Sequence, residues 1–333
     1  MEVAARPPAQ TPSDETAPST TSDATTKPWS VMLIGDTLLT RPVSDGADPF
    51  RVQSPLLSTA DIAIANLETA ITTRGDRQVK EYTFRSRPEL ALRLHDAGVD
   101  IVSLANNHSL DFGTVGLGDT INALIEAGVE PVGAGDNLAA AVEPVRRMVG
   151  TVRVAVFGAS QVIPAPKWVA TPTRAGVASA GKHVVDEATE HLLAAVQQAR
   201  ATNDVVIVMM HWGVERASCP TDVQIRTGAL LRKAGATAVV GAHPHVLQPI
   251  VRDATGVVAY SIGNFVWDPR GGVSGDTGII ELDFTGTAFT GVQFHPHKLN
   301  GNGWGAAVRS ETDRKRIDSQ VHRRCKGADG STW

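Results

Sequence analysis

Short apolar runs recur along the chain and stop at a glycine or a polar residue, which is the pattern of buried strands. Ser30–Gly35 is the first of these runs, and Asp61–Asn66 is the second. Further strands are expected at residues 100–105, 129–132, 152–157, 204–210, 238–241 and 257–260. Residues 278–284 and 289–294 are expected to form a late antiparallel pair.

Helical patterns separate most of these strands. Helices are expected at residues 87–95, with Pro88 in the first turn, and at 116–127, 186–201 and 222–234. Residues 165–181 contain several Pro, Gly, Ala and Thr residues and are expected to form a loop. The alternation of helices and strands predicts an α/β fold.

A single folded domain is expected over residues 29–300. Residues 1–28 are rich in Pro, Ser, Thr, Asp and Ala, which is typical of a disordered tail. Residues 301–333 are polar, and we expect them to form a loosely ordered C-terminal tail.

Polar side chains that can bind a metal or move a proton follow most of the predicted strands. They form these clusters: Gly35-Asp36-Thr37, Asn66-Leu67-Glu68, Asn106-Asn107-His108 with Asp111, His211-Trp212-Gly213, His243-Pro244-His245, and Asn264. Ligands of α/β proteins bind outside the carboxyl ends of the strands. We therefore expect these residues to form one shared site.

Taken singly, most of these residues have an ordinary structural explanation. Asp36 could cap a turn, and His211 could be a hydrogen-bonded core histidine. His243 and His245 are harder to explain in this way, because alternate positions near a strand end place both rings on one side. Pro244 would stiffen that geometry. The coincidence of so many clusters favours a functional site.

Charge and cysteine content narrow the classes of function. The chain has 31 basic and 35 acidic residues, a net charge of −4, which gives no support to nucleic-acid binding. Cys219 and Cys325 are too few for a disulfide framework or a cysteine-rich zinc site. No apolar run is long enough to span a membrane, and residues 1–28 lack the pattern of a signal peptide. We therefore expect a cytoplasmic protein, and the oligomeric state stays open.

The strand-end motifs together resemble the bacterial capsule synthesis CapA family, which has a calcineurin-like metallophosphatase fold. The matching segments are 35–36, 66–68, 105–113, 211–213, 241–245 with Gln248, and 260–265. The resemblance covers about residues 30–300. It implies a four-layer αββα sandwich, a metal site between the loops at the strand ends, and an association with poly-γ-glutamate.

The residues available to bind a divalent metal ion are Asp36, Glu68, Asn107, His211, His243 and His245. This set suits one cation better than two. Leu38 replaces the histidine of the usual Asp-x-His motif of two-metal phosphoesterases, and Asn66 replaces a bridging aspartate. The oxygen donors favour Mg, Mn or Ca, whereas the histidines favour Zn or Mn, so the metal is not identified.

Three further residues are candidates for proton transfer. The resemblance to this family implies that His108 occupies the position where metallophosphatases have a histidine beside the metal. Asp111 could orient the imidazole ring of His108. His295 follows the predicted strand 289–294 and is a candidate second base, although an exposed strand-end residue is an equally good explanation. Acid/base groups around a cation suit removal of a proton α to a carbonyl.

The best hypothesis from the sequence is metal-dependent Cα epimerisation of a C-terminal residue in a ribosomal precursor peptide. Some relatives of the family resemble lasso-peptide epimerases that perform this reaction. The first alternative is biosynthesis or processing of poly-γ-glutamate, in which Arg41, Arg74, Arg85 and Arg87 would bind carboxylates. Peptide hydrolysis, a metallophosphoesterase and a non-catalytic binding module stay open. The expected partner is a peptide or a poly-γ-glutamate-like polymer, with no nucleic acid and no membrane span.

Overall fold

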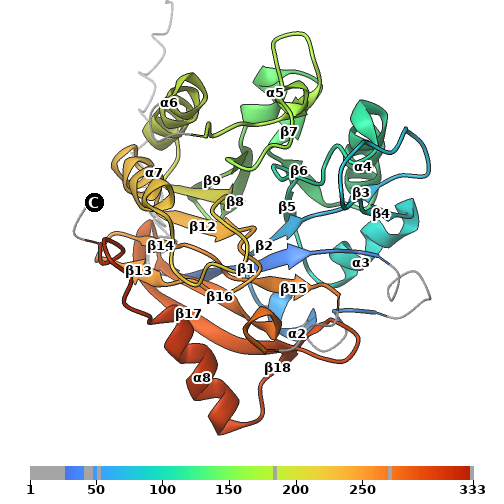
Figure 1. Ribbon diagram of the computed structural model, residues 1–333. Coiled ribbons are helices and arrows are strands. Elements are labelled where there is room, and N and C mark those ends of the chain that lie inside the picture. The colour runs from blue at the N-terminus through green and yellow to red at the C-terminus, as the bar shows by residue number, and fades with distance from the viewer. Residues whose placement is uncertain (1–26, 41–47, 51–53, 183–185, 269–271, 331–333) are drawn as a thin grey trace, which may run out of the picture.

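Two β-sheets face each other at the centre of the protein (Figure 1). The computed structural model describes residues 27–40, 48–50, 54–182, 186–268 and 272–330. The predicted disordered tail lies outside the described residues, except for Lys27 and Pro28.

The first sheet has eight strands in the order β18-β17-β16-β1-β2-β5-β6, and β15 also pairs with β1. β1, β2, β5, β6 and β15 run parallel, whereas β16, β17 and β18 are antiparallel additions at one edge. The bounds are β1 Pro28–Thr37, β2 Ile62–Leu67, β5 Ile101–Ser103, β6 Glu130–Val132, β15 Asn264–Val266, β16 Asp276–Thr285, β17 Ala288–Leu299 and β18 Gly305–Ala307.

The second sheet has six strands in the order β13-β14-β12-β11-β9-β8. Its central strands β9, β11, β12 and β14 are parallel, and β8 and β13 pair antiparallel at the two edges. The bounds are β8 Val145–Val149, β9 Val152–Ser160, β11 Val205–His211, β12 Ala238–Ala242, β13 Ile250–Arg252 and β14 Val257–Ala259. Two short pairs lie outside both sheets: β3 Ala70–Ile71 with β4 Arg85–Ser86, and β7 Ala134–Gly135 with β10 Gly176–Val177.

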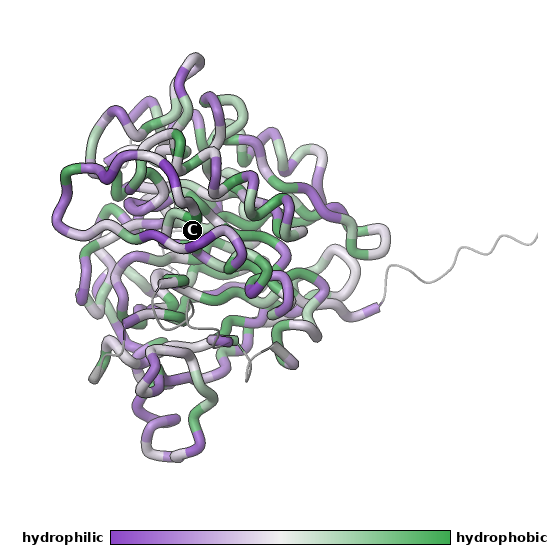
Figure 2. Tube along the Cα trace, turned by 90° about the vertical axis from the view of Figure 1, so that its right-hand side faces the viewer, coloured by the Kyte–Doolittle hydropathy of each residue, from purple (hydrophilic) through white to green (hydrophobic). Residues whose placement is uncertain are grey.

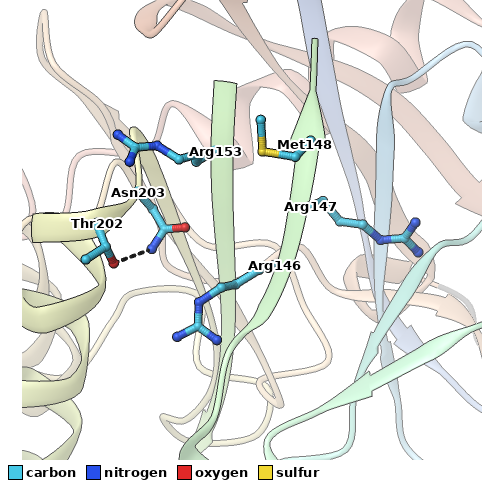
Figure 3. A pocket seen from close by; sticks show the side chains of 6 residues that line it. All are labelled: Arg146, Arg147, Met148, Arg153, Thr202 and Asn203. Atoms are coloured by element: carbon cyan, nitrogen blue, oxygen red, sulfur yellow. Dashed lines mark hydrogen bonds between the residues drawn. The ribbon is translucent and has the colours of Figure 1, made fainter. Parts of the chain in front are cut away.

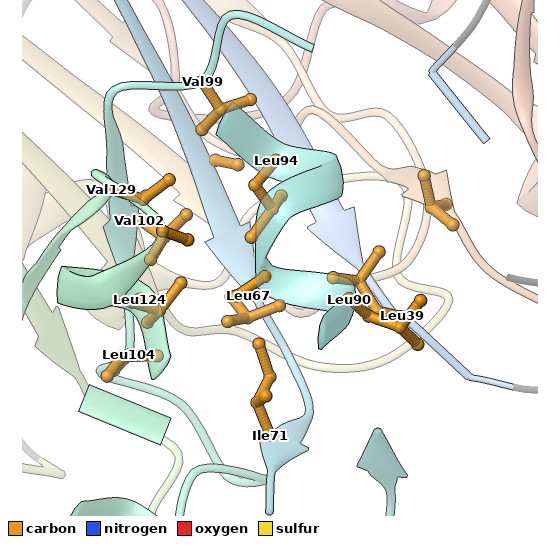
Figure 4. Close-up of a cluster of buried hydrophobic side chains, with 14 of the residues drawn as sticks. Leu39, Leu67, Ile71, Leu90, Leu94, Val99, Val102, Leu104, Leu124 and Val129 are labelled. Atoms are coloured by element: carbon orange, nitrogen blue, oxygen red, sulfur yellow. The ribbon is translucent and has the colours of Figure 1, made fainter. Parts of the chain in front are cut away.

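Helices cover the outer face of each sheet. α2 (Ser54–Leu57), α3 (Ala91–Asp96) and α4 (Gly113–Glu126) pack on the first sheet, and α6 (Glu187–Thr202) and α7 (Asp222–Lys233) pack on the second. Figure 4 shows the first outer layer, in which Leu94 of α3 and Leu124 of α4 meet Leu67 and Val102 of the sheet. Shorter helices are α5 (Leu138–Val142), η1 (Pro88–Leu90), η2 (Pro166–Trp168) and η3 (Gly272–Gly275).

The core between the sheets explains why the central strands are apolar along nearly their whole length. Val31 and Leu33 of β1 pack in one cluster with Val154 of β9 and Ile207 of β11. Parallel strands that are covered on both faces lack the alternation of half-exposed strands. Figure 2 shows these hydrophobic strands inside a polar periphery. The predicted four-layer αββα sandwich is confirmed.

Two regions differ from the expectation for loops and tails. The segment 165–181, expected as a loop, contains η2 and β10. Residues 301–330, expected to be loosely held, form β18 and α8 (Glu311–Val321), and Ile317 and Val321 of α8 are buried against the rest of the fold. Ser310 caps α8 by accepting a hydrogen bond from the amide of Asp313.

A disulfide bond fixes the end of this C-terminal segment. Cys219, in the loop between β11 and α7, is bonded to Cys325 beyond α8, and their Cα atoms are 5.7 Å apart. The two cysteines form no framework, as expected, but they do form this one crosslink. Within the described residues, no helix has the length and apolar character needed to cross a membrane.

Candidate metal centre and proton-transfer pair

The carboxyl ends of the two parallel strand groups meet at one polar cluster. Asp36 is the penultimate residue of β1, Glu68 follows β2, His211 ends β11 and His243 follows β12. Asp36 and Glu68 are 0% exposed, and His211 is 1% exposed. A hydrogen bond from the His243 amide to Oδ2 of Asp36, 3.2 Å long, joins the second sheet to the first. The expectation that the strand ends share a site therefore has a geometric basis.

Asp36 lies between residues from both halves of this cluster. Its Oδ1 accepts a hydrogen bond from Nδ2 of Asn66 at 2.8 Å, and its Oδ2 lies 2.9 Å from Nδ1 of His245. Burial raises the pKa of Asp36, but the hydrogen bond and charge of His245, the hydrogen bond of Asn66 and the charge of His243 together hold that pKa below its ordinary value. Burial lowers the pKa of His245, and Asp36 raises it above normal. The two residues therefore form a buried ion pair.

Glu68 is surrounded by imidazoles that it does not hydrogen-bond. Its Oε1 lies 3.7 Å from Nε2 of His211, 3.9 Å from Nε2 of His245 and 4.0 Å from Nε2 of His108. These distances are too long for hydrogen bonds, and Oε1 has no hydrogen-bond partner in the described part of the chain. Burial, followed by the charge of Asp36, raises the pKa of Glu68 well above normal. A divalent cation placed between this carboxylate and the surrounding imidazole nitrogens would satisfy all of them at once.

The donor atoms fit a divalent metal ion. Three groups each bring their ligand atoms within 4.8 Å of one another: Glu68 with His211 and His243, Asp36 with Glu68 and His245, and Glu215 with His243 and His245. Nδ1 of His243 is a second buried atom with no partner among the residues described. Mixed carboxylate and imidazole ligands suit Zn or Mn, and Mg and Ca favour the oxygens.

Backbone conformation brings His243 and His245 together. The sequence pattern predicted alternate strand positions, but β12 ends at Ala242, and both histidines have positive φ angles of 92° and 56°. This conformation is costly for residues other than glycine, and such strain gathers at functional sites. Both rings still reach the cluster, with their centroids 5.6 Å apart. The turn around Pro244, rather than strand alternation, is the physical reason.

The asparagines of the third cluster have different positions. Oδ1 of Asn107 lies 2.7 Å from Nε2 of His211, so this predicted ligand contacts the cluster through a histidine. Asn106 is fully buried and donates to the carbonyl of Leu67 at 2.8 Å. Its Oδ1 accepts the amide of His108 at 3.0 Å. Asn106 thus holds the loop after β5 against the end of β2.

His108 and Asp111 form the pair considered for proton transfer. Nδ1 of His108 lies 2.7 Å from Oδ2 of Asp111, which leaves Nε2 on the side of Glu68. Burial lowers the pKa of His108, although Asp111 opposes this effect. A neutral ring that donates from Nδ1 to a carboxylate has a free Nε2 able to accept a proton.

Lys80 is a residue that the sequence patterns did not identify. Its Nζ donates to Oδ1 of Asp111 at 2.8 Å and to the carbonyl of Asn107 at 2.5 Å, and it lies 3.2 Å from Nδ1 of His108. Burial lowers the pKa of Lys80, whereas Asp111 raises it. Lys80 lies in an irregular loop, where no periodicity or motif distinguishes one lysine from another.

Glu215 was also missed, and here a signal was present. It lies four residues after His211, in the loop that follows β11. This loop follows the carboxyl end of a central strand, and ligands of α/β proteins bind at such ends. A carboxylate in the loop was therefore a candidate ligand. Glu215 itself is exposed.

His295 does not join the cluster. β17 continues to Leu299, so His295 lies inside the strand opposite Ile279 rather than at its end. Ile279 packs in the outer core of the first sheet, and residues opposite each other on paired strands share a face. His295 therefore points to that outer face, where its Nε2 lies 2.7 Å from Oε2 of Glu281.

Comparisons with known proteins place this chain in a family. The model of the family described as "Bacterial capsule synthesis protein PGA_cap" matches residues 30–269. "Capsule biosynthesis protein CapA" of Bacillus anthracis is 31% identical over 301 residues, which cover 87% of this chain and 72% of that protein. "PGA biosynthesis protein CapA" of Bacillus subtilis (strain 168) is 30% identical over 248 residues, 72% of this chain and 63% of that protein.

A probable polyglutamine synthesis accessory protein of Mycobacterium tuberculosis is 33% identical over 221 residues, 64% of this chain and 57% of that protein. The chain thus spans less than two thirds of the Bacillus subtilis and Mycobacterium tuberculosis relatives. Among solved structures, 5′-nucleotidase from Candida albicans SC5314 superposes with a TM-score of 0.48 at 9% identity, covering 91% of this chain and 55% of that one. The family match and the Bacillus anthracis relative are sufficient to assign the chain, which belongs to the bacterial capsule synthesis protein family.

Proposed function

We propose that this protein is a metal-dependent enzyme that processes poly-γ-glutamate by acid/base chemistry at the peptide bonds of the polymer. The observation that carries the proposal is the buried Oε1 of Glu68, which has no hydrogen-bond partner among the described residues and faces imidazole nitrogens from both halves of the site. The class of substrate comes from the names of the relatives, which refer to capsule biosynthesis, PGA biosynthesis and polyglutamine synthesis.

The residues divide into those that would hold the metal and those that would move a proton. Asp36, Glu68, His211, His243 and His245 provide the ligand atoms. When bound, a divalent cation polarises a substrate carbonyl as a Lewis acid.

In hydrolysis of an amide bond of the polymer, His108 would take a proton from the attacking water at its Nε2 and return it to the amine that leaves as the C–N bond breaks. Asp111 orients the His108 ring by a hydrogen bond to Nδ1, and Lys80 holds Asp111 in place by a hydrogen bond to Oδ1. The ring of Phe84 packs against His108 with centroids 4.3 Å apart.

Cα epimerisation, the reaction that the sequence favours, is a second proposal for the same residues. The oriented ring of His108 suits it, but the reaction also needs a group on the opposite face of the Cα atom. The predicted second base, His295, is engaged with Glu281 on the outer face of the sheet. Epimerisation would therefore require another residue for the second proton.

Phosphoester hydrolysis is a third proposal, and the first strand disfavours it. Leu38 occupies the position of the expected histidine and is buried with Trp267 and Leu299 in a small apolar cluster. That side of Asp36 therefore has a hydrocarbon surface where a ligand would be needed. A chromogenic phosphodiester with Mn²⁺ tests this reading directly.

One experiment separates polymer processing from epimerisation. The full chain is loaded with Mn²⁺ and incubated with poly-γ-glutamate in deuterated water, with and without chelator. Chain length is measured by size-exclusion chromatography and deuterium at Cα by mass spectrometry. We expect shortening that disappears on chelation and in His108→Ala, by at least about 100-fold. His95→Ala is the matched control, because His95 is an exposed histidine on α3.

The outcomes point in different directions. Deuterium gained at Cα without shortening would replace polymer processing by epimerisation. Shortening that persists in His108→Ala would remove that residue from the mechanism. Intact, unlabelled polymer under every metal tested would overturn both proposals.

The compartment is a separate question. The cytoplasmic location expected from the sequence stays a prediction, and the bond between Cys219 and Cys325 gives a way to test it. Disulfides persist in oxidising compartments and are rare in a reducing cytosol. If the protein is cytoplasmic, blocking thiols in intact cells before lysis should alkylate both cysteines. Two unmodified, bonded cysteines would instead place it in an oxidising compartment.

A further inference from the structure

Two of the surface cavities in the described part of the chain are each lined by three arginine or lysine side chains, and they differ in whether those charges are already paired. The first, of about 290 Å³, lies beside β8 and β9 (Figure 3). Arg146, Arg147 and Arg153 line it, and each forms a salt bridge with a glutamate or aspartate. Its charges are neutralised within the protein, so it has little attraction left for an anion.

The second cavity, of about 240 Å³, has unpaired charges at its edge. It lies between the loop after β3 and the segment around η2, and Arg77 and Lys167 contribute to its lining. Nε of Arg77 donates to the hydroxyl of Thr83 at 2.6 Å, and Nζ of Lys167 donates to Oε1 of Gln78 at 2.9 Å. Across the described ranges, neither side chain forms a salt bridge with a carboxylate. Both partners are neutral, so both positive charges remain available to a ligand.

The inner wall of this cavity connects it to the proton-transfer pair. Trp168 is 3% exposed, and Nζ of Lys80 lies 5.2 Å from the centre of its ring. The same Nζ donates to Oδ1 of Asp111 at 2.8 Å and lies 3.2 Å from Nδ1 of His108. A group bound in the cavity is therefore separated from His108 by a single lysine side chain.

The remaining lining suits a ligand with both charged and apolar parts. Val79 is fully exposed at the edge, and Pro164 and Ala165 add apolar surface beside Lys167. A glutamate unit presents a carboxylate on a short hydrocarbon stem. Charged nitrogens beside apolar surface match that combination, because charge-assisted hydrogen bonds fix the carboxylate while the methylene groups are buried.

We propose that this cavity is a carboxylate-binding subsite, in which Arg77 and Lys167 hold a free carboxylate of the polymer next to the unit bound at the metal cluster. The inference rests on the proposed function and adds the part of the chain that recognises the anionic substrate.

The arginines that the sequence suggested for this role have other positions. Arg74 and Arg87 are paired with neighbouring carboxylates, and Arg85 lies over the ring of Phe112 at 4.0 Å. Arg41 lies outside the described residues. These arginines were chosen because they lie near the strand-end motifs in the sequence. Most of their charges already interact with other residues of the protein.

The test measures binding of a fluorescent γ-linked glutamate oligomer to the metal-loaded full chain by anisotropy. The neutral variants Arg77→Gln and Lys167→Met should each weaken binding about tenfold, which is the usual effect of losing one charged hydrogen bond. The charge reversal Lys167→Glu should weaken it further, and added salt should affect the variants less than the wild type. Lys315→Glu on α8 is the matched control, because Lys315 is an exposed lysine that does not line the cavity, and it should change affinity less than twofold.

A second probe defines the group that is recognised. The same oligomer with its free carboxylates amidated should bind weakly, and equally to wild type and variants. In turnover of the polymer, the variants should raise KM and leave kcat unchanged, because Arg77 and Lys167 touch no reacting atom.

Two failures can be told apart. If the wild type binds and shortens the polymer, and Arg77→Gln and Lys167→Met do the same with unchanged affinity, the subsite is wrong and the proposed function stands. If the metal-loaded wild type neither binds nor processes the polymer, the proposed function fails and the subsite fails with it. Equal weakening by Lys315→Glu would show a general effect of surface charge and would also overturn the subsite.

Discussion

The two sheets bring different chemistry to the same site. The first sheet supplies carboxylates and amides, with Asp36 near the end of β1 and Glu68 after β2. The second supplies imidazoles, with His211 at the end of β11 and His243 after β12. Each half alone is an incomplete ligand set, since oxygen donors without a cation repel one another and neutral imidazoles carry no charge. The comparison indicates that a complete set of candidate ligands forms only where the two sheets meet.

Burial acts on the two halves in opposite directions. It raises the pKa of Glu68, favouring the protonated acid, and it lowers the pKa of His211 and His243, favouring the neutral base. Without a metal, Glu68, His211 and His243 are therefore driven away from charge, whereas Asp36 and His245 stay paired. A divalent cation binds the ionised form of Glu68 and the neutral form of the histidines. Because Glu68 must lose its proton, metal binding should release protons.

The largest expected effect comes from removing one donor from each half. Glu68→Gln and His243→Gln should each weaken Mn²⁺ or Zn²⁺ binding by at least about 100-fold, because loss of an outer hydrogen-bond partner alone costs about 10- to 100-fold. Isothermal titration with the metal alone measures affinity and stoichiometry. If the two halves share one cation, the double variant should bind the metal only slightly more weakly than the single variant with the lower metal affinity. Separate cations would instead leave one intact binding event in each single variant.

The next effect concerns the pair beside the metal group. Asp111→Asn should lower turnover on the order of 100-fold, because the ring of His108 loses the carboxylate that fixes its orientation. Initial rates of polymer shortening measure this loss, with Asp318→Asn on α8 as the control. Removing Asp111 also removes an influence that raises the pKa of His108, so the acid limb of the rate profile should move to lower pH. Unchanged turnover would mean that His108 needs no orienting partner.

In the metal-free protein, the carboxylate half and the imidazole half of the site should change the free energy of unfolding in opposite directions as pH rises. The pKa of Glu68 is raised above its ordinary value of 4.5, so its contribution to stability is present below pH 4.5 and is lost as pH rises. The pKa of His243 is lowered from 6.5 to about 4, so its contribution is present above pH 6.5 and is lost as pH falls toward 4. The histidine contribution amounts to roughly 3 kcal/mol.

Thermal unfolding in chelator measures both trends. Glu68→Gln should remove the decline toward higher pH, and His243→Gln should remove the decline toward acid. Identical pH profiles for the two variants would contradict the opposite behaviour of the halves.

The smallest expected effect is at Glu215, the carboxylate that the second half contributes. Glu215→Gln should weaken metal binding only about 1.5- to 5-fold, because this side chain is exposed and solvent screens its charge. The same titration at low and high salt measures it, and the difference should shrink as salt rises. A loss as large as that of Glu68→Gln would show that Glu215 becomes buried when metal binds.

The parts of the site that follow strands could be predicted from sequence, and the parts that depend on loop conformation could not. Asp36, Glu68, His211 and His243 were found because apolar runs mark the strand ends and parallel strands bring those ends together. Lys80 was missed, because its approach to Asp111 depends on the path of an irregular loop. His295 was placed at a strand end only because the polar residues of β17 concealed its continuation to Leu299.

The layers of the fold followed from the same apolar runs, whereas the C-terminal segment did not. α8 is almost entirely polar and packs mainly through Ile317 and Val321, so its apolar periodicity is weak. Its start did carry a signal, Ser310 followed by acidic residues in the first turn, which is a common helix cap. A capping pattern was thus more informative here than hydrophobic spacing.

The disulfide also divides the ligands between two topological parts of the chain. Cys219 and Cys325 are separated by 106 positions and close a covalent ring that contains His243 and His245, whereas Asp36, Glu68 and His211 lie outside it. A single proteolytic cut anywhere between the two cysteines opens this ring without releasing a fragment. A nicked molecule would therefore keep the histidines of the turn tethered to the rest of the cluster, and would separate into two pieces only under reducing conditions.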